Sequence, residues 1–95
     1  MAKKIIWTDL AIERYRQVVN YLTDNWSDQE AIKFIQIVNT KLELLSRFNF
    51  LGRSYSADRN IRQILITKHN CLIYKIEPDK IILLEIFDTR QKEKN

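Results

Sequence analysis

The sequence predicts an α+β fold in which two helices cover one face of a small, mostly antiparallel sheet. Apolar residues in the first half recur every three or four residues, as on amphipathic helices, whereas those in the last third alternate with a period of two, as on strands. With 95 residues, 45% of them hydrophobic, the chain can fill the core of a single domain, residues 1–95. We therefore expect the order strand, helix, helix, strand, strand, strand, written β-α-α-β-β-β.

The first strand and the first helix are predicted from residues 4–26. Residues 4–7 are a short apolar segment that we expect to form the N-terminal strand. Thr8 offers a hydroxyl to the free amides of a helix start, and Asp9 suits the positive end of the helix. The apolar positions that follow span about four turns: Leu10 or Ala11, Tyr15, Val18, Val19, Leu22 and Trp26. This spacing predicts an amphipathic helix.

A second helix is predicted to begin at residue 28. Residues 27–30 read Ser-Asp-Gln-Glu, a capping box in which the Ser27 hydroxyl accepts from the Glu30 amide and the Glu30 carboxylate reaches back to the Ser27 amide. Apolar residues then continue at helical spacing for about twenty residues, and Phe48 would extend the series: Ala31, Phe34, Ile35, Val38, Leu42 and Leu45. Because only a few residues separate the two helices, an antiparallel helical hairpin is the simplest arrangement.

The last third predicts a loop followed by three strands. Residues 50–60 lack a clear period and contain the only glycine, Gly52, so we interpret them as a loop. Three segments rich in β-branched residues follow, at 61–67, 71–76 and 81–87, and they predict a meander. The last is apolar on both faces except at Glu85, which is typical of an inner strand.

Composition excludes several classes of protein. The longest apolar stretch is too short to span a bilayer, and the N-terminus lacks the apolar region of a signal peptide, so we expect a cytoplasmic protein without membrane contact. The single cysteine, Cys71, cannot form an internal disulfide. With one histidine there is no metal-ligand cluster, and no cofactor is implied. The net charge of +4, with three of the four charges in residues 50–95, favours an anionic partner.

Several short motifs together resemble the toxins of the RelE/ParE superfamily. They are the Ile6-Trp7-Thr8 ending of the first strand, the helical hairpin, Arg62 at the start of the second strand, the segment KHNCLIYKI with Tyr74, and the ending FDTRQ. Each motif is weak alone, but their order and spacing cover nearly all of the chain. The resemblance implies a RelE/ParE-like fold and the toxin component of a type II toxin-antitoxin module, of the kind also known as plasmid stabilisation systems.

The resemblance also implies partners, while it leaves the target open. A cognate antitoxin protein would neutralise the toxin by wrapping it. RelE-like members cut ribosome-bound mRNA, whereas ParE-like members inhibit DNA gyrase, so the fold does not decide whether this chain is an enzyme. A decayed toxin that retains only antitoxin binding is a further alternative.

Metal-free RNA cleavage requires a base, an acid and cations around the phosphate. If the chain is a nuclease, the catalytic candidates are Arg62, Arg90, Lys68 and His69. The resemblance implies a phosphate-binding role for Arg62, with a solvent-exposed or salt-bridged arginine as the alternative, and it implies the closing arginine of the last strand for Arg90. For Arg90 the alternative is an ion pair with Asp88, which shares its face on an extended strand. His69 has a suitable ordinary pKa but lies with Lys68 in an expected turn, where solvation alone is the alternative.

We expect structural roles for Tyr74 and Cys71, and the C-terminus favours one of the two possible targets, gyrase and mRNA. Tyr74 alternates with apolar residues and is expected in the core, and Cys71 is expected to be a structural thiol. After Arg90 the chain ends in QKEKN, without the Tyr or His that nuclease members commonly carry near the C-terminus. The sequence therefore favours a ParE-like gyrase inhibitor, with a RelE-like endoribonuclease as the alternative.

Overall fold

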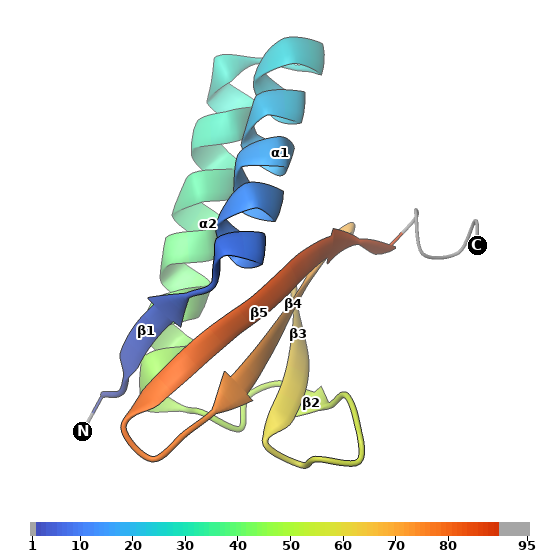
Figure 1. The fold of residues 1–95 in the computed structure, drawn as a ribbon. Coiled ribbons are helices and arrows are strands. Elements are labelled where there is room, and N and C mark those ends of the chain that lie inside the picture. Colours follow the sequence, from blue (N-terminus) through green and yellow to red (C-terminus); the bar gives the residue numbers. More distant parts are fainter. Residues whose placement is uncertain (1, 90–95) are drawn as a thin grey trace.

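Two helices pack on one face of a five-stranded mixed sheet in the computed structural model, which describes residues 2–89 (Figure 1). The elements are β1 (Lys4–Trp7), α1 (Asp9–Asn25), α2 (Asp28–Arg47), β2 (Arg53–Ser54), β3 (Ile61–Thr67), β4 (Asn70–Ile76) and β5 (Lys80–Asp88). The predicted fold class and the predicted order of the elements are confirmed. The one element that the sequence did not predict is β2.

The strand order in the sheet is β1-β5-β4-β3-β2. β1 runs parallel to β5, with Lys4 opposite Lys80 and Trp7 opposite Leu83, while all other neighbours are antiparallel. β5 thus has a strand on each side, which explains its apolar residues on both faces. The prediction of an inner last strand is confirmed.

β2 lies within the segment predicted to be a loop, residues 50–60. It consists of two residues, Arg53 opposite Gln63 and Ser54 opposite Arg62. Two residues are too few to show an alternation of apolar and polar side chains, so the sequence pattern could not reveal this strand. Its effect is to attach part of the loop to the edge of β3.

Both helices begin at the predicted capping residues. The amide of Ala11 donates to Thr8 Oγ1 at 3.1 Å, and the amide of Glu30 donates to Ser27 Oγ at 3.1 Å. The second half of the capping box is replaced: the Ser27 amide donates to the carbonyl of Leu22, and the Glu30 carboxylate pairs with Lys33 at 3.3 Å. The end of α1 therefore already satisfies the amide that Glu30 was expected to bind. Neither helix is long and apolar enough to cross a membrane.

The core lies between the helical hairpin and the covered face of the sheet. Its largest fully buried side chains are Tyr74, Leu45, Leu72, Ile81, Leu83, Ile86 and Val38. Trp7, Tyr15 and Phe34 extend this core as an aromatic row, with ring centroids 5.1 Å and 5.9 Å apart. The expectation that Tyr74 belongs to the core is confirmed, because the residue is fully buried.

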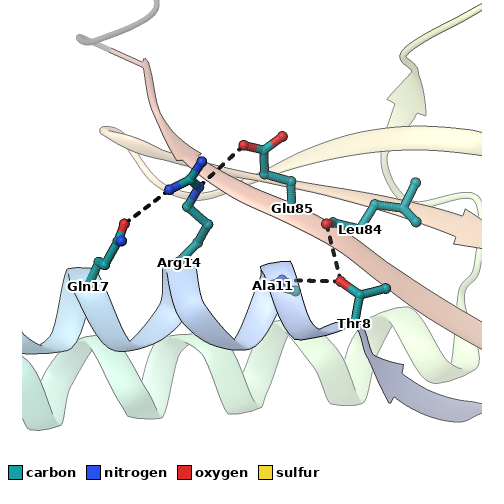
Figure 2. A network of polar contacts seen from close by, with 6 residues as sticks. All are labelled: Thr8, Ala11, Arg14, Gln17, Leu84 and Glu85. Carbon is teal, nitrogen blue, oxygen red and sulfur yellow. Dashed lines mark hydrogen bonds and ion pairs between the residues drawn. The ribbon is translucent and has the colours of Figure 1, made fainter.

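A bulge in β5 attaches the start of α1 to the sheet (Figure 2). Leu83 is opposite Tyr74 and Glu85 is opposite Ile73, so Leu84 is an extra residue on β5. Thr8 Oγ1 donates to the carbonyl of Leu83 at 2.7 Å. The same oxygen lies 3.3 Å from the carbonyl oxygen of Leu84, the contact that Figure 2 shows. Six residues after Thr8, on α1, Arg14 Nε lies 3.5 Å from Glu85 Oε2. The hairpin is thereby fixed to the central part of β5.

Candidate functional site

Arg62, the first candidate from the sequence, holds the backbone of the loop before β3. Its Nε donates to the carbonyl of Gly52 at 2.8 Å, and its Nη1 donates to the carbonyl of Arg59 at 3.0 Å. The guanidinium carbon also lies 5.0 Å from the centre of the Phe50 ring, a cation–π geometry. Three points of the loop are therefore joined through one half-buried side chain.

Tyr74 binds the backbone of the same loop through its hydroxyl group. It lies opposite Arg62 across the β3–β4 pair, and its hydroxyl donates to the carbonyl of Asn49 at 2.9 Å. The same oxygen accepts from the amide of Gly52 at 3.0 Å. Burial raises the pKa of Tyr74 above its ordinary value of 10.0, and the Gly52 amide and the Arg62 charge act in the opposite direction without reversing the shift.

Gly52 is the point at which the two anchoring side chains meet. A Cβ at this position would lie 2.4 Å from the carbonyl oxygen of Gln63 and 2.8 Å from the Tyr74 hydroxyl. The requirement for glycine is thus one of space, because its φ is not positive. We call Gly52, Arg62 and Tyr74 the loop anchor.

Lys68 and His69 lie at the opposite end of β3, in the turn to β4. Lys68 is exposed and His69 is partly buried. The amide of His69 donates to Thr67 Oγ1 at 3.2 Å, and its carbonyl accepts from the amide of Thr89 at 2.9 Å. The turn is therefore joined to the end of β5, with Asn70 opposite Asp88.

The structure does not bring the described candidates together. Arg62 lies at the start of β3 and His69 in the turn after its end, and the five residues from Arg62 to Thr67 alone span roughly 16 Å at about 3.3 Å per residue. Arg90, and with it the expected Asp88–Arg90 ion pair, lies outside the described residues. Within residues 2–89 there is no group of three His, Cys, Asp or Glu side chains that could hold a metal ion.

The sheet carries a hollow of about 390 Å³, lined by Arg53, Gln63, Ile64, Leu65, Cys71, Phe87 and Thr89. Arg53 is the one charged residue in this lining. Cys71 is buried, and its Sγ donates to Gln63 Oε1 at 3.5 Å, consistent with the expected structural thiol. Sequence reasoning did not single out Arg53; its place one residue after the only glycine was the available signal.

Comparisons with known proteins place the chain in a family. Residues 5–93 match the family model described as the ParE toxin of the type II toxin-antitoxin system, parDE. The match covers nearly all of the chain, and the chain therefore belongs to this toxin family. The comparison with curated proteins found no match.

Solved toxin structures have the same fold. A chain of the chromosomal ParDE toxin-antitoxin system from P. aeruginosa is 15% identical, with a TM-score of 0.74 and coverage of 92% of this chain and 96% of that chain. A mutant of the E. coli toxin RelE in the free state is 11% identical, with a TM-score of 0.67 and coverage of 98% and 90%. The RelBE2 toxin-antitoxin complex from Mycobacterium tuberculosis is 12% identical, with a TM-score of 0.66 and coverage of 93% and 99%.

Proposed function

We propose that this toxin acts by inhibiting DNA gyrase and that a cognate antitoxin neutralises it. The observation that carries the proposal is the match of residues 5–93 to the ParE toxin family. ParE-like members of the superfamily are gyrase inhibitors, as the resemblance in the sequence implied. The protein then acts as a binder, and its surface rather than a catalytic constellation determines its activity.

The geometry of the described candidates supports a binder. General acid–base catalysis requires each proton-transferring group to lie within hydrogen-bond reach of the reacting atoms. His69 and Arg62 lie at opposite ends of β3, and the Arg62 guanidinium already donates to two backbone carbonyls. A phosphate at Arg62 would be restricted to the guanidinium N–H groups that these two bonds leave over. In the endoribonuclease alternative, Arg62, Lys68, His69 and Arg90 would carry the chemistry.

The proposed antitoxin partner is supported by the similar structures. Two of them are described as parts of a toxin-antitoxin system or complex, from P. aeruginosa and M. tuberculosis. An antitoxin for this chain would occupy enough of its surface to prevent contact with the target. Binding without toxicity would correspond to the decayed-toxin alternative.

The test is induction of this gene alone in bacterial cells, with DNA synthesis and translation measured separately. The proposal predicts growth arrest with an early fall in DNA synthesis, and relief when the antitoxin is co-expressed. His69→Ala and Lys68→Ala, which remove the two candidates in the turn after β3, should both arrest growth as the unmodified chain does. An early fall in translation with loss of arrest in His69→Ala would instead establish the nuclease alternative.

A further inference from the structure

We infer that residues 47–59, here named the loop surface, dock an acidic segment of the antitoxin that carries apolar side chains. The inference rests on the proposed function, because the antitoxin is part of that proposal. The loop surface includes the C-terminal end of α2, the whole of β2 and the turn before β3. Three features point to such a segment: exposed apolar side chains, a local excess of positive charge and a fixed backbone.

Large apolar side chains are exposed together on the loop surface. The exposed fractions are 60% for Phe48, 56% for Phe50, 49% for Leu51 and 41% for Tyr55. These four residues lie within eight positions of the chain, whereas the other exposed large apolar side chains of residues 2–89, such as Trp26 at 70% and Ile32 at 53%, are spread along the sequence. Several large exposed apolar side chains on one short segment indicate an interaction site more than single ones scattered over a surface do.

The positive charge of the described chain is concentrated in the same region. Residues 47–59 contain three arginines and one acidic residue, Asp58, whereas residues 2–46 contain six basic and six acidic residues and residues 60–89 contain four of each. Arg47 pairs with Glu43 at 3.1 Å, and Arg62 holds the loop backbone. Within residues 2–89 the side chains of Arg53 and Arg59 have no partner, so two guanidinium groups are available to carboxylates.

The backbone of the loop surface is held in place before any partner binds. The loop anchor fixes Asn49, Gly52 and Arg59 by hydrogen bonds of 2.8 to 3.0 Å. The amide of Tyr55 donates to the carbonyl of Ile61 at 2.9 Å, and Asp58 Oδ1 accepts from the amide of Asn60 at 2.9 Å. A surface that is already ordered loses less conformational entropy on binding, which favours its use as a docking site.

The balance of apolar and cationic groups favours a protein segment over a nucleic acid. Single-stranded nucleic acids are bound by a basic groove that follows many phosphates, together with stacking aromatic rings. The loop surface has four exposed large apolar side chains and two arginines that are unpaired within residues 2–89, and one of the apolar residues, Leu51, cannot stack on a base as an aromatic ring does. Aromatic residues and arginines around an apolar centre are typical of protein interfaces.

The experiment measures binding of full-length antitoxin to the full-length toxin by isothermal titration calorimetry. The double variant Arg53→Glu/Arg59→Glu should bind at least ~30-fold more weakly. Arg53→Lys/Arg59→Lys keeps the charge and should bind within about fivefold of the unmodified protein. Lys4→Glu/Arg16→Glu is the matched control, because it makes the same change of charge at two exposed positions outside the loop surface and should bind normally. Leu51→Asp tests the apolar contribution and should weaken binding at least ~10-fold.

The outcomes separate the inference from the proposed function. Thermal unfolding of each variant establishes that it is folded. If the unmodified toxin binds the antitoxin and both Arg53→Glu/Arg59→Glu and Leu51→Asp bind within threefold of it, the inference is wrong and the proposed function stands. If the unmodified toxin binds no antitoxin, the proposed function fails and the inference with it. If Arg53→Glu/Arg59→Glu loses affinity for a single-stranded oligonucleotide but not for the antitoxin, the loop surface is a nucleic-acid site and the inference is overturned.

Discussion

The guanidinium of Arg62 donates from Nε to the carbonyl oxygen of Gly52 at 2.8 Å, across ten positions of the chain. The resemblance assigned to this arginine the binding of a phosphate. In the structure its fork instead joins two backbone carbonyls and lies against the Phe50 ring. The arginine therefore has a structural task that is independent of any nucleic acid.

Arg62→Ala should lower the free energy of unfolding by about 2 kcal/mol, because two hydrogen bonds from a charged group and one cation–π contact are lost. Arg62→Lys should recover little, since an ammonium group cannot reproduce the planar fork. Urea unfolding measures both values. Arg59→Ala is the control, because the Arg59 side chain has no partner within residues 2–89, and it should be nearly neutral. If the Arg62→Ala protein is as stable as the unmodified one, Arg62 does not contribute to holding the loop.

Tyr74→Phe should also cost about 2 kcal/mol, because the amide of Gly52 and the carbonyl of Asn49 lose their common partner. The pKa of Tyr74 is raised in the folded state, so the folded protein holds the phenolic proton more tightly than the unfolded chain. The resulting contribution to stability is fully present below pH 10 and is lost as the pH rises through the folded-state pKa. The free energy of unfolding should therefore fall less steeply above pH 10 in Tyr74→Phe. Equal slopes for the two proteins would contradict this.

Gly52→Ala should destabilise the protein by about 1–3 kcal/mol, because the new methyl group would meet the Gln63 carbonyl and the Tyr74 hydroxyl. Ser54→Ala, at an exposed position in β2, is the comparison that leaves this contact unchanged. Differential scanning calorimetry of the two variants gives the difference. If Gly52→Ala and Ser54→Ala have the same melting temperature, the loop moves away from β3 without loss of stability.

Thr8→Ala should cost more stability than Ser27→Ala, although both remove a helix N-cap worth about 1 kcal/mol. The Thr8 hydroxyl also donates to the carbonyl of Leu83 at 2.7 Å, whereas Ser27 is exposed and caps α2 alone. We expect a difference of about 1 kcal/mol in urea unfolding between the two variants. Equal losses would show that the contact between Thr8 and β5 adds nothing to stability.

The features predicted correctly are those that depend on residues close together in the sequence. Thr8 and Ser27 cap their helices because a hydroxyl before an apolar period satisfies a free amide wherever it occurs. The inner position of β5 follows from apolar residues on both faces. The bulge at Leu84 has no such pattern, because an extra residue in an unbroken apolar run leaves the sequence looking regular.

The site was predicted less well because its contacts are made to backbone atoms distant in the sequence. The core position of Tyr74 follows from alternation, but the partners of its hydroxyl, Asn49 and Gly52, lie more than twenty residues away. The contact of Arg62 with the Gly52 carbonyl likewise cannot be predicted from the sequence, because every residue has a backbone carbonyl. The single glycine of the chain was the one visible sign that the loop approaches another backbone closely.

The most direct test of gyrase inhibition is a supercoiling assay with purified gyrase, relaxed plasmid and the purified toxin. The account predicts that supercoiling is blocked as the toxin is added and restored by an equimolar amount of antitoxin. It also predicts that mRNA on purified ribosomes stays intact at the same toxin concentration. Normal supercoiling together with cleavage of ribosome-bound mRNA would contradict the account and identify the chain as an endoribonuclease.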